Sequence, residues 1–427
     1  MTRYDQVKNG LFKTNRSKLI SNMENGTMAI FHSNDLLPKN ADQHMPFKQN
    51  SDLFYLTGID QEETALLIIK SESINTEVLF IKKTNDTIKV WEGEKLSKKQ
   101  AANISGVELV MWNSEFEKTL TQNLKLCHTV LLNSNEHPRA NIVVETRDAR
   151  FSKWIKAKFP TLNYDKVANI LYPIRSVKMP EEINMIERAC EITRGGVDRV
   201  LNYIKPGVYE FELEAEIIHE FLKNRSRGFA YEPIIASGKN ACILHYNSNN
   251  SICQNGDLVL MDFGAEYGNY ASDLTRCFPV SGVFTKRQKS VYNAVLRVMR
   301  GAISMLRPGT VLEDYEKNVG QLMERELYDL GLINKKDIMS KSKVPAYKKY
   351  FMHGTSHHMG LDVHDVSNPQ APLEAGMVLT CEPGIYIPEE SLGIRLENDI
   401  LITTTGNIDL MANIPIEVDE IESLINI

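Results

Sequence analysis

Four carboxylates in the second half of the sequence lie where they could bind metal ions. Asp262 and Asp273 stand in strand-like apolar runs on either side of Glu266-Tyr267-Gly268-Asn269, a strong turn signal. If Tyr267-Gly268 is the two-residue loop of a hairpin, the two aspartates face each other directly, with Cβ atoms ~4.5 to 5.5 Å apart. Two carboxylates at that separation repel each other, so we expect a cation between them.

A second pair, Glu382 and Glu397, flanks the connection from Pro388 to Gly393, and its spacing leaves the register open. Carboxylate oxygens together with an imidazole suit hard or borderline divalent ions, and four carboxylates neutralise two such ions. A pair of metal ions ionises a bridging water and polarises a carbonyl, which is the chemistry of hydrolysis. The alternative for each acid alone is a surface charge or a structural ion pair, but the strand-turn setting of all four favours the metal site.

Histidines supply the imidazole. His353, His357, His358 and His364 fall within one twelve-residue segment of a chain that has 10 histidines in all. This clustering indicates a functional segment. A single histidine on a strand is more often a core or surface residue, and we assign that ordinary role to His358.

The elements that must position these side chains form a weak internal repeat. The triplets Lys205-Pro206-Gly207 and Arg307-Pro308-Gly309 each end one amphipathic helix and precede another, expected at residues 211–222 and 312–330. Strand-like runs follow in both copies. A duplicated unit of this kind, folded about a pseudo-two-fold axis, brings the four carboxylates to one place.

The spacing of the functional side chains repeats as well. In the first copy, His245 precedes Asp262 by 17 residues, and in the second, His364 precedes Glu382 by 18 residues. Each copy then supplies one more carboxylate further along the chain. The repeat therefore predicts two matching halves of a single site.

The first part of the chain carries no comparable chemistry. Short apolar runs at 65–69, 78–81 and 130–132 alternate with polar, helix-compatible stretches, which is typical of an α/β domain. The pattern breaks at Pro173 and Pro180, and a long amphipathic helix begins with Pro180 in its first position. We therefore expect an α/β (α+β) protein, with a mixed α/β domain over residues 1–174 and a second domain over residues 175–427.

Composition excludes several classes of protein. The net charge is -6 and the pI is near 6.0, so nothing draws the whole molecule to nucleic acid or to an anionic membrane. No apolar run reaches the ~18 residues needed to span a bilayer, and the N-terminus lacks the apolar core of a signal peptide. The six cysteines are scattered without a paired spacing, as is typical of reduced thiols. We expect a cytoplasmic protein that acts on a small molecule or peptide.

Several motifs together resemble one family. The segment His353-Gly354-Thr355-Ser356-His357-His358-Met359-Gly360-Leu361-Asp362-Val363-His364-Asp365 is similar to the proline-peptidase signature H-G-x-S-H-x-x-G-L-D-V-H-D. Residues 49–58 and Trp91-Glu92-Gly93 resemble the N-terminal domain of the same family. With these motifs, nearly the whole chain resembles the aminopeptidase P (Xaa-Pro aminopeptidase) family of pita-bread metallopeptidases. The remaining motifs that carry the resemblance are Cys242-Ile243-Leu244-His245-Tyr246, residues 261–264, Ser272-Asp273-Leu274-Thr275-Arg276, Glu382-Pro383-Gly384 and Gly393-Ile394-Arg395-Leu396-Glu397.

The resemblance implies a C-terminal pita-bread domain with pseudo-two-fold internal symmetry that holds two divalent metal ions. Two ligands, Asp273 and Glu397, are expected to bridge both ions. Manganese is the usual activating metal of the family, while the ligand types also permit Zn²⁺, Co²⁺ or Fe²⁺. The implied metal ligands are Asp262, Asp273, His357, Glu382 and Glu397.

The resemblance also implies residues that act on the substrate or orient the ligands. Three histidines match substrate-side positions, where they can donate hydrogen bonds to the scissile carbonyl as it becomes an oxyanion and assist the leaving proline nitrogen. Glu382 is the candidate proton shuttle from the metal-bound water. Tyr231 and Arg395 match outer positions that orient ligands and substrate. The substrate-side histidines are His245, His353 and His364.

The implied function is hydrolysis of the N-terminal Xaa-Pro bond of peptides by a hydroxide that bridges the two metal ions. The tertiary amide of proline has no N–H and its ring fixes φ, so ordinary aminopeptidases handle this bond poorly. One alternative is a prolidase that accepts only Xaa-Pro dipeptides, but Ser356 stands where prolidase-like sequences tend to have glycine. The second alternative is a pita-bread scaffold that has lost catalysis and serves as a binding module; the presence of all five ligand types argues against it.

By resemblance, the N-terminal domain mediates subunit contacts and narrows the entrance to the pocket, so we expect a homodimer or homotetramer. The sequence departs from relatives at Asn398, where they often have an acid, and in the short connection between Glu382 and Glu397. Six lysines between Lys335 and Lys349 form a basic segment, which we interpret as a solvated loop rather than a docking surface.

Overall fold

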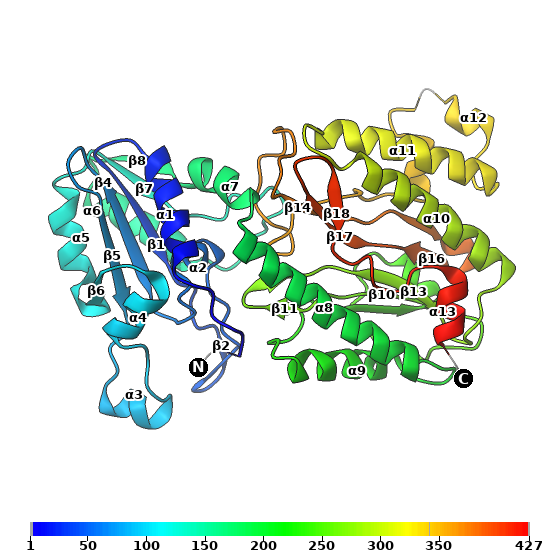
Figure 1. Cartoon of the computed structure of the whole chain (residues 1–427), viewed down its shortest axis with the longest axis horizontal. Helices are drawn as coiled ribbons and strands as arrows, with labels where there is room; N and C mark the ends of the chain where they lie inside the picture. Colours follow the sequence, from blue (N-terminus) through cyan, green and yellow to red (C-terminus); the bar gives the residue numbers. More distant parts are fainter. Residues whose placement is uncertain (1–2, 341, 426–427) are drawn as a thin grey trace. The chain divides into compact units, whose positions relative to one another are not determined.

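The computed structural model describes residues 3–340 and 342–425. They form two compact units, of which the first is drawn mainly in blue, cyan and blue-green and the second mainly in green to red in Figure 1. The first unit is Gln6–Arg175, and the second consists of the described residues from Ser176 onward together with Arg3–Asp5. This division lies next to the boundary expected at residue 174. No helix in the described ranges is long and apolar enough to cross a membrane.

The first unit is built on a six-stranded sheet with the order β6-β5-β4-β1-β7-β8. Strand β4 runs antiparallel to β1 and β5, whereas the other neighbouring strands are parallel. The apolar runs expected as strands lie in β4, β5 and β7. The bounds are β1 (Thr27–His32), β4 (Ala65–Lys70), β5 (Thr76–Ile81), β6 (Leu109–Trp112), β7 (Thr129–Leu132) and β8 (Asn163–Lys166), with a separate pair β2 (Pro38–Asn40) and β3 (Gln43–His44).

Helices of the first unit close an apolar core against this sheet. Leu120, Leu124 and Ile155, from α5 and α6, pack into the same buried cluster as the apolar residues of β1, β4, β5 and β7. One sequence expectation fails here, because Pro173 lies inside helix α7 and does not mark a break. The helices are α1 (Gly10–Asn22), α2 (Ser51–Thr57), α3 (Asp86–Trp91), α4 (Lys98–Ser105), η1 (Asn113–Glu115), α5 (Phe116–Leu124), α6 (Arg147–Lys158) and α7 (Ala168–Ser176).

The second unit contains two halves with the same order of elements. In the first half, α8 (Pro180–Tyr203) and α9 (Glu210–Lys223) precede a sheet of order β13-β10-β9. In the second half, α10 (Lys286–Met305) and α11 (Leu312–Asp329) precede a sheet of order β14-β17-β18. The predicted helix pairs are confirmed, as is the start of α8 at Pro180, where Glu182 accepts a hydrogen bond from the Met179 N–H.

Short elements complete the second unit. The basic segment contains α12 (Lys335–Ile338) and η3 (Ala346–Lys349), so helical turns interrupt the expected loop; Lys341 lies outside the described residues. The other bounds are β9 (Ile234–Ser237), η2 (Gly238–Cys242), β10 (Leu258–Asp262), β11 (Glu266–Tyr267), β12 (Tyr270–Ala271), β13 (Thr275–Pro279), β14 (Val378–Cys381), β15 (Gly384–Ile387), η4 (Pro388–Glu390), β16 (Leu392–Arg395), β17 (Asn398–Ile402), β18 (Asn407–Asp409) and α13 (Val418–Leu424).

The turn of the first hairpin differs from the expected one. Strands β11 and β12 pair with Tyr267 opposite Tyr270, so the two-residue loop is Gly268-Asn269 rather than Tyr267-Gly268. Both loop residues have positive φ, +59° and +70°. A type I′ hairpin turn requires positive φ at both positions, and glycine and asparagine adopt it far more readily than tyrosine does.

This turn shifts the register of the hairpin by two residues. Asp262 lies opposite Thr275 in the ladder of β10 and β13, not opposite Asp273, so the predicted direct pairing of the two aspartates is wrong. A shift of two residues leaves every side chain on its original face of the sheet. Asp262 and Asp273 therefore still share a face, as diagonal rather than direct neighbours.

The second hairpin has the register that places its acids together. Cys381 lies opposite Asn398 and Gly384 lies opposite Arg395, so the unbroken count between them puts Glu382 directly opposite Glu397. The two halves meet at an isolated antiparallel bridge between Thr275 and Glu397. The backbone N–H of Glu397 donates to the Thr275 carbonyl at 3.1 Å. This bridge places the acids of one half next to those of the other half.

Candidate metal centre

Strand ends position the four carboxylates of the centre. Asp262 ends β10 and Asp273 lies just before β13, while Glu382 follows β14 and Glu397 precedes β17. Asp273 and Glu397 are buried, whereas the side chains of Asp262 and Glu382 keep exposed fractions of 13% and 19%. The centre is thus accessible from the side of Asp262 and Glu382.

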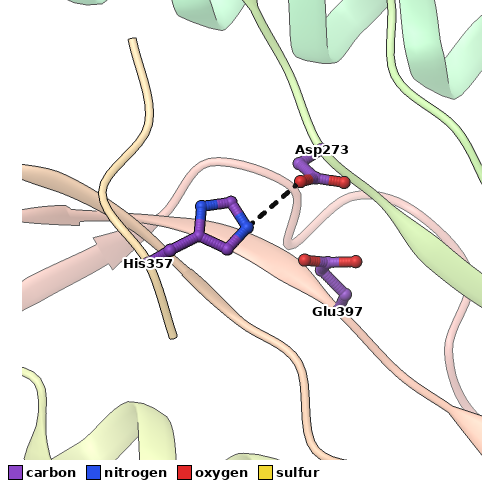
Figure 2. Close-up of side chains that lie close together, drawn as sticks. All are labelled: Asp273, His357 and Glu397. Atoms are coloured by element: carbon purple, nitrogen blue, oxygen red, sulfur yellow. Dashed lines mark ion pairs between the residues drawn. The ribbon is translucent and has the colours of Figure 1, made fainter. Parts of the chain in front are cut away.

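Three of the predicted ligands bring their side chains to one point. One ligand atom from each of Asp273, His357 and Glu397 lies within 4.8 Å of the others. Figure 2 shows the imidazole and the two carboxylates converging from three separate segments of the chain. One imidazole with carboxylate oxygens is a donor set that suits a divalent ion of the manganese or zinc type.

The imidazole of His357 is oriented as a metal ligand would be. Its Nδ1 lies 3.1 Å from the carbonyl oxygen of His358, so Nδ1–H donates there. Its Nε2 faces the carboxylates, 3.5 Å from Asp273 Oδ2 and 3.6 Å from Glu382 Oε1. A hydrogen bond on the second ring nitrogen is the usual way in which proteins fix the tautomer and direction of a metal-binding histidine.

The electrostatics of the centre favour an added cation. Burial raises the pKa of Glu397 well above its usual range, and neighbouring carboxylates raise it further. Burial also raises the pKa of Glu382, to about 7, against the lowering effect of His357 and Arg395. Burial works to lower the pKa of His357, but Asp273 and Glu382 outweigh it and raise this pKa to about 9. Protons and metal ions therefore compete for the same position, and the residues fit a metal centre.

Tyr231 connects the two aspartates of the first hairpin. Its hydroxyl lies 2.6 Å from Asp262 Oδ1 and also forms a hydrogen bond with Asp273 Oδ1. Burial, followed by the charges of both aspartates, raises the pKa of Tyr231 well above its usual range. The phenol therefore stays protonated and remains a donor to the carboxylates.

Arg395 joins the two hairpins from the other side. Its guanidinium forms an ion pair with Asp262 Oδ2 and donates to the hydroxyls of Tyr386 at 2.9 Å and Thr275 at 3.1 Å. Thr275 donates in turn to Glu397 Oε2 at 2.6 Å. Arg395 is 4% exposed, so these contacts hold it in one geometry behind the ligands.

His353 lies beside Glu382, with both ring nitrogens already in contact with protein groups. Its Nδ1 is 2.7 Å from the Gly354 carbonyl oxygen and 3.7 Å from Glu382 Oε2, while Nε2 is 2.8 Å from the Tyr386 hydroxyl. Burial, then the charge of Arg395, lowers the pKa of His353 to about 3. His353 is therefore a neutral imidazole at physiological pH.

The other two substrate-side histidines are exposed. The ring of His364 packs edge-on against the ring of His357, with centroids 4.5 Å apart. His245 lies on the turn after η2, and its side chain has no hydrogen-bond partner among residues 3–340 and 342–425. Its charge contributes to the lowered pKa of His353, which places it in the same neighbourhood.

Sequence reasoning did not assign roles to Tyr386 and Thr275. A period of two along β14 and β15 puts Tyr386 on the same face as Glu382, and this was the available signal. Thr275 falls within a quoted motif, but its position opposite Asp262 follows only from the corrected register.

Comparisons with known proteins agree with this arrangement. Residues 184–404 match the sequence model of metallopeptidase family M24, and residues 12–132 match that of the aminopeptidase P N-terminal domain. The chain is 37% identical to the Xaa-Pro aminopeptidase of Escherichia coli K12, over 97% of each chain. It is 30% identical to human Xaa-Pro aminopeptidase 3, over 88% of this chain and 76% of that one. The solved structure of zinc-substituted Escherichia coli aminopeptidase P in complex with product superposes with a TM-score of 0.88, at 35% identity and 99% coverage of both chains.

Proposed function

This chain belongs to the aminopeptidase P family of the M24 metallopeptidases, and we propose that it is a hydrolase that removes the residue before proline at the N-terminus of peptides. The predicted family and the predicted pita-bread fold of the second unit are confirmed. The observation that carries the function is the direction of His357. Its Nε2 is turned toward Asp273 and Glu382 by the hydrogen bond on Nδ1.

The cofactors are divalent metal ions. We propose two of them, with Asp273 and Glu397 shared between both, and manganese as the activating metal; zinc, cobalt and iron(II) are compatible with the same donors. When bound, such ions ionise a water near neutral pH and polarise a peptide carbonyl. The residues proposed to hold them are Asp262, Asp273, His357, Glu382 and Glu397.

Glu382 is suited to move a proton. Its side chain keeps an exposed fraction of 19%, so the carboxylate can reach a water molecule on the accessible side of the centre and exchange a proton with it. We expect its carboxylate to take the proton of the attacking water and pass it to the proline nitrogen. That nitrogen has no N–H of its own and leaves readily only when it is protonated.

The histidines divide into two roles. His364, whose ring packs against His357, and His245 are both exposed, and they remain the candidates that donate a hydrogen bond to the scissile carbonyl as negative charge develops on its oxygen. His353, the third histidine that we propose for the substrate side, contacts the Gly354 carbonyl and the Tyr386 hydroxyl through its two nitrogens and therefore also orients Tyr386.

Tyr231 and Arg395 are proposed to orient the ligands. Each binds an aspartate of the first hairpin through a hydrogen bond that fixes the direction of the carboxylate. Partners of this kind commonly change metal affinity or activity by about 10–100-fold when they are removed.

For the rest of the molecule, we propose an N-terminal domain over residues 1–174 that contacts other subunits of a homodimer or homotetramer and narrows the entrance. The catalytic domain is then 175–427. The partners are peptides with proline at position two, not nucleic acid or membrane, and we propose a cytoplasmic location.

The test is manganese-dependent release of the first residue from Xaa-Pro-Xaa tripeptides and Xaa-Pro dipeptides side by side. Asp262→Ala removes a proposed ligand, and Asp314→Ala, at an exposed acid of α11, is the matched control. Tripeptide cleavage that survives in Asp314→Ala and disappears in Asp262→Ala supports the proposal.

Two other outcomes contradict it. Cleavage of dipeptides alone would make the enzyme a prolidase. No cleavage of either substrate with manganese, zinc, cobalt or iron(II) would return the second alternative, a pita-bread scaffold that binds without catalysis.

A further inference from the structure

Glu210 is a buried carboxylate that the proposed chemistry does not use. It is the first residue of helix α9 and is 0% exposed. Within the described part of the chain it has no ion-pair partner. A buried carboxylate without a cation is costly unless hydrogen bonds replace those of water, although the helix N-terminus contributes a favourable dipole.

Five hydrogen bonds satisfy this carboxylate. Oε1 accepts from the Ser237 N–H at 2.7 Å, from the Ser237 hydroxyl at 2.7 Å and from Asn240 Nδ2 at 3.1 Å. Oε2 accepts from the Tyr246 hydroxyl at 2.8 Å and from the Ser251 N–H at 2.9 Å. Every donor belongs to one stretch of chain, residues 237–251, which Glu210 thereby gathers around itself.

That stretch carries His245. Because the His245 side chain has no hydrogen-bond partner among the described residues, no side-chain contact of that kind fixes the imidazole, and the position of the backbone limits the region that the ring can reach. The next residue, Tyr246, is bound to Glu210, and Ser237 and Asn240 are bound to it on the preceding side. We propose that Glu210 is a positioning residue, which holds His245 at the metal centre by fixing the segment 237–251. This inference rests on the proposed function.

The position requires a carboxylate rather than an amide. Each carboxylate oxygen accepts from a backbone N–H, Oε1 from Ser237 and Oε2 from Ser251. A backbone N–H can only donate, so neither position can accept a hydrogen bond from the side chain. In Glu210→Gln, the NH₂ group must therefore meet an N–H in either orientation. One anchor of the segment is lost while the size of the side chain is unchanged.

The experiment compares Glu210→Gln with Glu212→Gln. Glu212 lies on the same helix and accepts from the Tyr209 N–H and the Tyr203 hydroxyl, so it caps α9 without touching the segment 237–251. We expect His245→Ala to lower kcat for a Xaa-Pro-Xaa tripeptide by about 100–1000-fold. Glu210→Gln is expected to lower kcat by about 10–100-fold with KM changed less than about threefold, while Glu212→Gln retains kcat.

The decisive readout is a double-mutant cycle, because a general structural defect would not depend on His245. If Glu210 acts through His245, adding Glu210→Gln to His245→Ala lowers kcat by less than about threefold further. The inference would be overturned if the two decreases in kcat multiplied in the double variant. A Glu210→Gln enzyme with wild-type kcat would overturn it as well.

The variant Tyr246→Phe provides a second test of the inference in case Glu210→Gln does not fold. It removes a single donor to Glu210 and leaves both backbone donors in place, and we expect a smaller loss of kcat that also vanishes in the His245→Ala background. An additive cycle with Tyr246→Phe would count equally against the inference. A wild-type enzyme that cleaves no tripeptide refutes the proposed function, whereas an additive cycle in an active enzyme refutes only the role of Glu210.

Discussion

Glu382 and Glu397 stand directly opposite each other in the second hairpin, because Cys381 pairs with Asn398 on one side of them and Gly384 pairs with Arg395 on the other. Opposed residues of an antiparallel ladder have Cβ atoms roughly 4.5–5.5 Å apart, and like charges at that distance destabilise the pair. The folded hairpin is therefore stable only when protons or metal ions offset the repulsion between these two carboxylates.

The first prediction concerns the pH dependence of the chelated protein. The folded-state pKa of Glu382, about 7, lies above the ~4.3 of an unfolded glutamate. Its contribution to stability is therefore full below about pH 4 and is lost as the pH rises through 7. After treatment with a chelator, we expect a higher Tm at pH 5.5 than at pH 8, measured by scanning fluorimetry. Metal-saturated protein should lack this decline; a chelated Tm that increases with pH would contradict the argument.

Tyr231→Phe should weaken metal binding without unfolding the chain. The substitution removes the hydroxyl that bonds to both Asp262 and Asp273 but keeps the ring. We expect metal affinity to fall by about 10–100-fold in a competition titration against a chelator. Tyr292→Phe is the control, because its buried hydroxyl donates to the Ile416 carbonyl at 2.8 Å, outside the metal centre. Equal affinity in wild type and Tyr231→Phe would remove Tyr231 from the centre.

Gly264→Ala should disrupt the first hairpin. Gly264 lies opposite Asp273 in the corrected register, and a Cβ there would meet the Ser272 carbonyl oxygen at 1.7 Å. The backbone that carries Asp273 must move, so we expect loss of bound metal together with a destabilisation of about 3 kcal/mol or more. Metal content and urea unfolding measure both effects. Gly406→Ala, where a Cβ meets nothing within 4 Å, should behave like wild type.

Arg395→Lys should keep the positive charge but lose the arrangement of hydrogen bonds that the guanidinium makes. A lysine has a single nitrogen and cannot reproduce the contacts to Asp262, Tyr386 and Thr275 together. We expect kcat/KM for a tripeptide to decrease by about 10–100-fold, whereas Arg297→Lys, at an exposed ion pair with Glu326, is neutral. Wild-type activity in Arg395→Lys would show that charge alone suffices at this position.

The sequence predicted the elements better than their exact alignment. Helical periodicity and proline position located α8, and the repeat located the helix pairs, since these signals extend over many residues. The register of the first hairpin depended on two residues, Gly268 and Asn269, whose positive φ selects the turn. The predicted loop was centred one residue too early. For that reason the predicted partner of Asp262 was Asp273, whereas the observed partner is Thr275.

The site was predictable where it is local in sequence and not where it is assembled across the fold. The histidine cluster and the acids on strand ends could be found by their spacing. No periodicity relates the positions that Arg395 joins through its hydrogen bonds with Tyr386 and Thr275. The same is true of the hydrogen bonds between Glu210 and the segment 237–251. Such contacts depend on how sheets and loops pack, which a single sequence does not encode in any short pattern.

The bridge between Thr275 and Glu397 unites residues that are 122 positions apart. During synthesis, a ribosome that has released the first half of the catalytic unit has not yet made the glutamates of the second half. A nascent chain therefore cannot assemble the full set of ligands, and a truncated product lacks the same groups. Peptidase activity is therefore expected only after the chain has been made beyond Glu397 and the second half has folded against the first.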